Sequence, residues 1–255
     1  MRIAVRCGYT RCVIKNLLRA LSALALSVLP LAAHTSVHAQ PAGRPAPVSP
    51  AAVASKVVAP FAGTDVPLFQ ALAWIGEAEE PEPRTGYRRA EFKHWNKGLN
   101  ATDGCDTRRE VILAEAKLAP EVGPKCALTG GRWWSEYDQV WITEAAALDV
   151  DHMVPLAEAW DSGADTWTAT RREAYANDQG TPNSLIAVSG TSNRSKADKD
   201  PADWRPVPAY RCTYAAEWVA AKLRWRLTAD VAERDALNRL AETCPTTTVT
   251  YKQVP

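Results

Sequence analysis

The stretch LDVDHMVP, residues 148–155, predicts a short strand over 148–151 that runs into an acid and a histidine. A second apolar strand is predicted over 185–188, and SNRSK, residues 192–196, opens a short helix. Between the strands, a further helix is predicted over 169–176. The pattern therefore predicts a strand that ends in Asp-His, a second strand that pairs back on it, and a helix that carries Asn and Lys.

These residue types suit metal-assisted hydrolysis of a phosphodiester. Asp151 and Asn193 are hard oxygen donors of the kind that Mg²⁺ accepts. His152 is able to take a proton from an attacking water near neutral pH. Lys196 and Arg194 are charged donors that suit flanking phosphates.

The same residues resemble the ββα-metal motif of the HNH endonuclease family, and in particular its secreted branch related to the C-terminal domain of GmrSD-type restriction enzymes. The shared elements are an Asp-His-x-x-Pro strand end at 151–155, Asn183 before the second strand, and Asn-x-x-Lys at 193–196. The resemblance extends to GCDTR at 104–108 and AYRC at 209–212, and so covers most of residues 87–244.

The resemblance implies a role for each matching residue. His152 would be the general base, and Asp151 and Asn193 the metal ligands. Asn183 would hold the loop between the strands and orient His152, while Lys196 would lie near the phosphate.

The same donor set implies one Mg²⁺ or Mn²⁺ ion per site rather than Zn²⁺, because carboxylate and amide oxygens are hard ligands. A third protein ligand is not identified. Asp149 and Asp200 are weak candidates for it.

Composition places the motif in a globular, exported chain. The 255 residues are 46% hydrophobic and 23% charged, which excludes a disordered chain, a collagen-like repeat and a coiled coil. Residues 1–39 carry five basic residues and no acid, and their apolar run at 21–33 is short for a membrane span. We expect a signal peptide cleaved near Ala39, a secreted (extracellular or periplasmic) protein, and no membrane association beyond that peptide. An uncleaved N-terminal anchor is the alternative.

The expected domain organisation is a signal peptide (1–39), a flexible Pro/Ala-rich linker (40–67), one HNH endonuclease domain (68–246) and a tail (247–255). Other predicted elements are a helix over 106–118 capped by Asp106, a hairpin over 133–143, a helix over 214–225, and a last helix capped near Thr228. This inventory is an α+β fold rather than alternating βαβ units. The resemblance implies a ββα-metal (HNH, or His-Me finger) core with short antiparallel strands, surrounded by helices.

Four cysteines follow the leader, and in an oxidising compartment they predict two disulfides. Three pairings are possible, and we favour the one that is local in sequence. It joins Cys105 to Cys126 and Cys212 to Cys244.

Charge supports a nucleic acid as the substrate. Beyond residue 39 the chain has 25 basic and 29 acidic residues, whereas residues 190–226 hold eight basic and four acidic ones. A basic face around the motif attracts a polyanion. The sequence thus predicts a secreted, monomeric, metal-dependent endonuclease that acts on DNA, with RNA left open. The alternative is a secreted, disulfide-stabilised binding module with an inactive nuclease-like motif.

Overall fold

The computed structural model of the protein describes residues 65–78, 84–181 and 184–255. The expected signal peptide, most of the expected linker and Asn183 lie outside the described residues.

The described residues combine α-helices with short strands, in the α+β arrangement that the sequence predicts. The helices are α1 (Leu68–Leu72), α2 (Thr107–Ala114), α3 (Leu156–Asp161), α4 (Ala169–Ala176), α5 (Gly190–Lys196), α6 (Arg211–Trp225) and α7 (Val231–Glu242). The strands are β1 (Val66–Pro67), β2 (Gly76–Glu77), β3 (Glu121–Gly123), β4 (Ala127–Thr129), β5 (Trp133–Ser135), β6 (Val140–Ile142), β7 (Leu148–His152), β8 (Leu185–Ser189), β9 (Thr228–Ala229) and β10 (Thr248–Val249). They form two-stranded pairs, antiparallel except for the parallel pair β2–β9.

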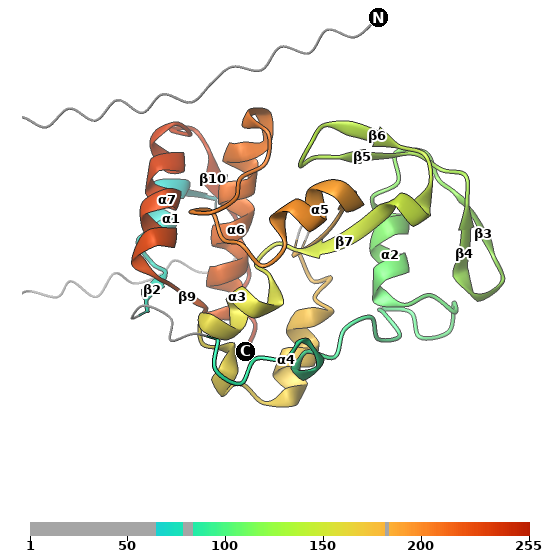
Figure 1. The fold of residues 1–255 in the computed structure, drawn as a ribbon, viewed down its shortest axis with the longest axis horizontal. Coiled ribbons are helices and arrows are strands. Elements are labelled where there is room, and N and C mark those ends of the chain that lie inside the picture. The colour runs from blue at the N-terminus through green and yellow to red at the C-terminus, as the bar shows by residue number, and fades with distance from the viewer. Residues whose placement is uncertain (1–64, 79–83, 182–183) are drawn as a thin grey trace, which may run out of the picture. The chain divides into compact units, whose positions relative to one another are not determined.

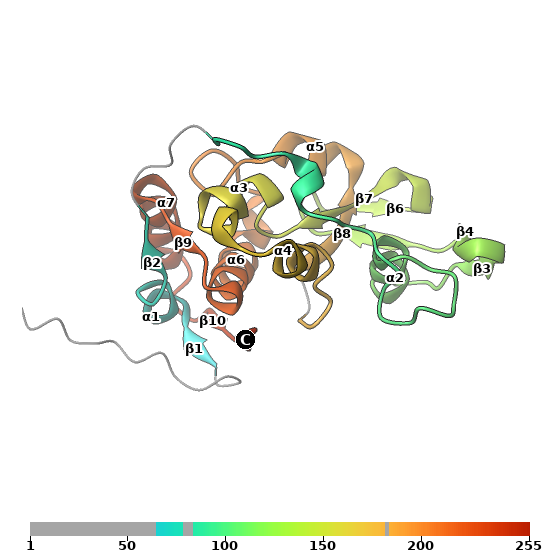
Figure 2. The same cartoon turned by 90° about the horizontal axis from the view of Figure 1, so that it is seen from below.

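The pair β7–β8 lies between α2 and α5 (Figures 1 and 2). Leu148 is opposite Ser189 and His152 is opposite Leu185, so the two strands pair along their whole length. Helix α5 begins directly after β8, where the Ser189 side chain accepts a hydrogen bond from the Ser192 backbone N–H. Helices α3 and α4 lie in the connection between the two strands.

One face of the β7–β8 pair is apolar. Its residues form a cluster with α2 and β5, made of Val111, Ile112, Trp133, Leu148, Val150, Leu185 and Ala187. Because successive side chains of a strand point to opposite faces, Asp149 and Asp151 point away from this cluster, toward α5. The alternation in LDVD thus separates the acids from the core.

A second, larger cluster surrounds α6. Tyr214, Trp218 and Trp225 are buried there, in contact with residues of α1 and α7 (Figure 1). Next to them, β1 pairs with β10 and brings together residues on either side of the expected 68–246 domain.

Helices α5 and α6 begin earlier than predicted, at Gly190 and Arg211, and two other helix boundaries also differ from the prediction. Helix α2 begins as expected, with the Asp106 carboxylate accepting from the Arg109 N–H at 2.8 Å, but it ends at Ala114 rather than Leu118. The backbone N–H of Leu118 instead donates to the Arg132 carbonyl, in a bridge that draws the chain out of the helix.

The last helix, α7, is capped by Asp230 and not near Thr228. The Asp230 carboxylate accepts from the Glu233 N–H at 2.8 Å. Thr228 lies in β9, opposite Gly76, so its backbone is extended.

Both disulfides form in the sequence-local pairing. Cys105–Cys126 joins the residue before the α2 cap to the turn between β3 and β4, and Cys212–Cys244 joins the first turn of α6 to the end of α7. Across residues 65–78, 84–181 and 184–255, no helix has the length and hydropathy needed to cross a membrane.

Candidate active site

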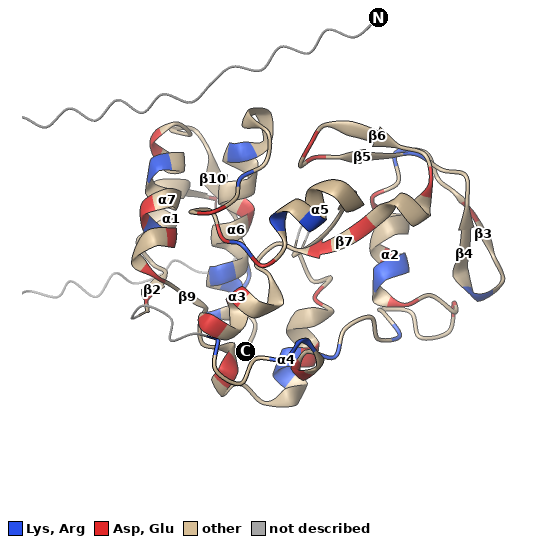
Figure 3. Ribbon diagram, viewed as in Figure 1, with Lys and Arg blue, Asp and Glu red and all other residues tan. Residues whose placement is uncertain are grey.

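A cavity of about 250 Å³ lies where the end of β7 meets α5 and the 3-10 turn Arg89–Glu91. It is lined by Arg89, Val150, Asp151, His152, Pro155, Leu156, Asn193, Arg194, Ala197 and Asp198. The structure therefore brings Asp151 and His152 together with Asn193 and Arg194, as the motif predicts. Figure 3 shows acidic residues of β7 next to basic residues of α5.

His152 is buried and held by its neighbours. Its Nε2 lies 2.9 Å from the Ala176 carbonyl oxygen. Because a carbonyl only accepts, Nε2 carries the ring proton and Nδ1 keeps its lone pair. The rings of Trp95 and Tyr175 are nearly parallel to the imidazole, with centroids 5.5 and 6.3 Å away. Burial lowers the pKa of His152 to about 3, so the imidazole is neutral near neutral pH.

Asp151 is held by a tyrosine and a lysine. Its Oδ2 accepts from the Tyr137 hydroxyl at 2.7 Å and from Lys196 Nζ at 2.6 Å. Nζ also donates to the His152 carbonyl at 3.0 Å. Burial raises the pKa of Asp151 and lowers that of Lys196, against the attraction between the two groups. Lys196, expected near a phosphate, is fully buried and links the carboxylate of Asp151 to the backbone of His152.

Asn193 and Arg194 share one acid on β7. Asn193 Nδ2 donates to Asp149 Oδ2 at 3.3 Å, and Arg194 reaches the same oxygen at 3.2 Å. Asp149 therefore lies beside the predicted ligand Asn193. Asp200, the other weak ligand candidate, accepts from the Ala202 N–H at 2.6 Å and is not among the residues lining the cavity.

Within the described ranges, no group of three or more His, Cys, Asp or Glu side chains is arranged to hold a metal ion. Among the residues that line the cavity, the side-chain oxygen donors are the carboxylates of Asp151 and Asp198 and the amide of Asn193.

A larger cavity, of about 360 Å³, lies beside α2 and β8. Its walls include Glu115 and Asp178, and no Lys or Arg of the described residues lines it. Glu115 accepts from the Ala187 N–H at 2.9 Å, and burial raises the pKa of its carboxyl to about 7. Two carboxyl groups without a lining cation do not suit a phosphate, so we assign the candidate site to the smaller cavity.

Three contributors to the site are not apparent in the motif. Tyr137 lies in the expected 133–143 hairpin, where a Tyr-Asp pair reads as a turn. Ala176 contributes a backbone carbonyl, for which no side-chain pattern exists. Arg89 lies far upstream, in a Tyr-Arg-Arg run whose only signal is its charge. Asn183 lies outside the described residues, so its predicted role stays a prediction.

Comparison with known proteins identifies the family. Residues 108–240 match the C-terminal domain of GmrSD restriction endonucleases. A protein of Arthroderma benhamiae, described as an uncharacterized secreted protein, is 39% identical over 163 residues, which are 64% of this chain and 78% of the relative. No solved structure matches the chain significantly.

Proposed function

Because the chain belongs to the family of GmrSD restriction endonuclease C-terminal domains, we propose that it is an exported, metal-dependent HNH-type endonuclease that hydrolyses phosphodiester bonds of DNA. The observation that carries the proposal is the single cavity that Asp151, His152 and Asn193 share. These residues come from a strand–strand–helix unit, β7–β8–α5, whose order is that of the ββα-metal core.

His152 is the proposed general base. Its Nε2–H is engaged by the Ala176 carbonyl, so Nδ1 is the nitrogen free to take a proton. The water oxygen forms a bond to phosphorus as its proton moves to Nδ1. The bond from phosphorus to the leaving oxygen breaks, and that oxygen takes a proton from solvent. The aromatic rings beside His152 fix the imidazole plane, so little reorganisation is needed.

Asp151 and Asn193 are the proposed ligands of one Mg²⁺ or Mn²⁺ ion. Their chemistry fits, because Mg²⁺ binds through one or two carboxylates, keeps several waters and accepts substrate phosphate oxygens. Among the described residues, Asp151 Oδ1 and Asn193 Oδ1 have no hydrogen bond, so one oxygen of each is available. A bound ion would stabilise negative charge on the phosphate and the leaving oxygen.

Export is part of the proposal. The relative from Arthroderma benhamiae is described as secreted, and both disulfides of this chain suit an oxidising compartment. The predicted signal peptide, cleaved near Ala39, would deliver the protein there.

The test is plasmid cleavage by the secreted, oxidised protein, with Mg²⁺, with Mn²⁺ and with EDTA. His152→Ala should lower the rate by about 10²- to 10⁴-fold, because a general base contributes about that much. His94→Ala is the matched control. His94 Nδ1 lies 2.8 Å from the Phe92 carbonyl, and its loss should leave the rate within about threefold, the scale of a residue outside the proton transfer.

Nicking and linearisation that need both a divalent metal and His152 would support the proposal. Circular dichroism would establish that each variant is folded. Absence of cleavage of DNA and RNA with every metal, from a folded and disulfide-bonded protein, would contradict it and favour the binding-module alternative.

A further inference from the structure

We propose that Arg89 is a phosphate-binding residue of this site, whose guanidinium binds the non-bridging oxygens of a phosphodiester seated in the cavity. The inference rests on the proposed nuclease function and names a substrate contact that the sequence motif does not contain.

Arg89 belongs to a different wall of the cavity from the motif residues. It begins the 3-10 turn Arg89–Glu91, whereas Asp151 and His152 end β7 and Asn193 lies on α5. The cavity thus has a cation on one wall, and the proposed metal ligands and general base on the others.

The backbone that carries Arg89 is firmly held. Phe92, directly after the turn, is fully buried, with its ring centroid 6.0 Å from that of Tyr175. The Glu91 carbonyl accepts from Arg172 Nε at 3.2 Å. A fixed backbone places the Arg89 side chain at the cavity without further ordering of the main chain.

The Arg89 side chain is exposed and, among the described residues, has no hydrogen bond or ion pair. Two other arginines, one adjacent in sequence and one at the same cavity, differ from Arg89 because each is paired with an acid. Arg88 is paired with Glu91 at 2.7 Å, and Arg194, also at the cavity, is paired with Asp149 at 3.2 Å. A guanidinium offers five donors in a planar fork that matches phosphate oxygens. Arg89 is therefore the cation at this cavity whose donors are available to a substrate.

The experiment measures binding without turnover. Each variant is made in the His152→Ala background, and its affinity for a short fluorescein-labelled DNA duplex is followed by fluorescence anisotropy in EDTA over a range of salt concentrations. Arg89→Ala should raise the Kd by about 10- to 100-fold, the range for loss of charge-assisted hydrogen bonds. The slope of log Kd against log salt should fall by about 0.9, as expected for one lost phosphate contact.

Arg88→Ala is the matched control, since it removes the same charge one residue away and should leave the Kd within about threefold. Arg89→Lys should recover part of the affinity, because it restores the charge without the fork. Unchanged binding by Arg89→Ala would overturn the inference. An equal loss of affinity in Arg88→Ala would overturn the inference too, because it would indicate general electrostatic attraction to DNA rather than a specific phosphate contact.

Cleavage assays with His152 intact separate this inference from the proposed function. If no protein cleaves nucleic acid while Arg89→Ala alone weakens binding, the enzyme proposal fails and the phosphate contact stands. If cleavage needs His152 and metal but the two arginine variants have equal KM, the enzyme stands and the role of Arg89 is refuted.

Discussion

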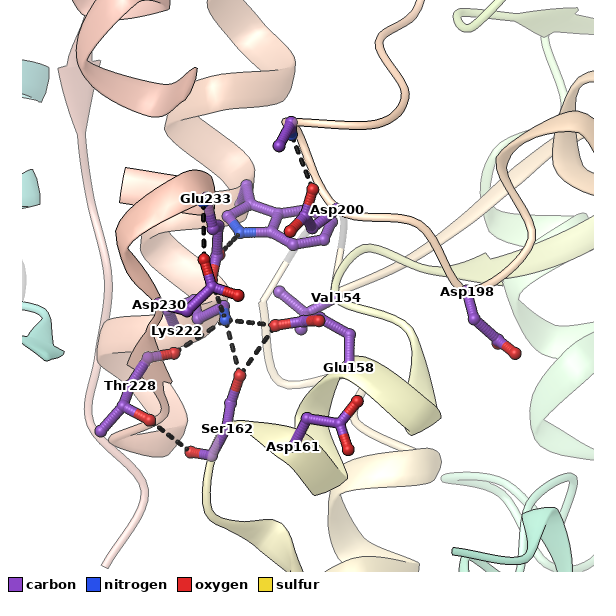
Figure 4. Close-up of polar contacts among 12 residues, drawn as sticks. Val154, Glu158, Asp161, Ser162, Asp198, Asp200, Lys222, Thr228, Asp230 and Glu233 are labelled. Atoms are coloured by element: carbon purple, nitrogen blue, oxygen red, sulfur yellow. Dashed lines mark hydrogen bonds and ion pairs between the residues drawn. The ribbon is translucent and has the colours of Figure 1, made fainter. Parts of the chain in front are cut away.

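Two lysines among the described residues are fully buried, and they differ in the number of carboxylates that they contact. Lys222 lies among α3, α6 and α7, where its Nζ donates to Glu158, Ser162, Glu233 and the Thr228 carbonyl at 2.7 to 2.8 Å (Figure 4). Lys196 lies beside the candidate site, with one carboxylate and one carbonyl as partners.

The number of contacting carboxylates decides whether the pKa of each lysine is raised or lowered. Burial lowers the pKa of Lys222, but Glu158 and Glu233 outweigh it, so that pKa is raised. For Lys196, burial outweighs the single carboxylate of Asp151, and the pKa is lowered. The cluster around Lys222 is a charged cross-link between helices, whereas the pair under the cavity is only partly compensated. Of these two lysines, the one whose pKa is lowered thus lies beside the site where chemistry is proposed, and the one whose pKa is raised lies in the helical core.

The largest effect on stability is expected at Lys222. Lys222→Met should lower the free energy of unfolding by about 3–5 kcal/mol, because it leaves two buried carboxylates without their cation. Urea denaturation followed by tryptophan fluorescence measures this loss. Cleavage per folded molecule should stay within about twofold, since the cluster does not reach the cavity.

The double variant Lys222→Met with Glu233→Gln is the control for the stability loss expected of Lys222→Met. It removes one of the stranded charges and should recover part of the stability. A Lys222→Met variant as stable as the parent would show that the cross-link contributes nothing.

Glu115, a half-buried acid with no ion pair to another described residue, extends the comparison of the two lysines. The pKa of Glu115 is raised by burial from 4.5 to about 7, so between these pH values the folded protein holds a proton that the unfolded chain releases. Wild-type stability should therefore fall as the pH rises from 4.5 to 7. Glu115→Gln removes this dependence while keeping an acceptor for the Ala187 N–H.

The variant should be more stable than the parent at pH 8 by on the order of 3 kcal/mol, with the difference vanishing near pH 4. Urea denaturation at the two pH values measures it. A difference independent of pH would contradict the raised pKa.

Lys196→Met is expected to have the smallest effect on stability, about 1–3 kcal/mol, because Asp151 keeps its bond from Tyr137 and takes up a proton readily. The two variants should also differ in the rate of cleavage, which Lys196→Met should lower and Lys222→Met should leave nearly unchanged. Lys196 holds both the Asp151 carboxylate and the His152 carbonyl, so kcat should fall by about 10-fold or more. Kinetics and urea denaturation on the same two variants test this difference, and it would be contradicted if Lys196→Met left kcat unchanged or if Lys222→Met lowered kcat as much.

The sequence predicts the elements of the site well because those signals are local. The alternation in LDVDHMVP identifies β7 and its acids, and the SNRSK run identifies α5. The two disulfides also follow a local rule, since each joins cysteines close in sequence. Local prediction is weaker at helix ends. Helix α2 stops before Leu118 because a distant residue, Arg132, pairs with its backbone.

By itself, then, the sequence predicted the strands and the helix of the β7–β8–α5 unit, and it supplied the residues for which we propose a chemical role. Only the tertiary structure decided what those residues touch. The proton on His152 Nε2 follows from the Ala176 carbonyl at the end of α4, and the partners of Asp151 are a buried lysine and a tyrosine. Among the described residues, Arg89 is the cation of the cavity lining that has no hydrogen bond or ion pair. Such contacts depend on how separate segments pack. No short-range periodicity encodes packing, because each contact is set by the sum of many weak interactions across the core.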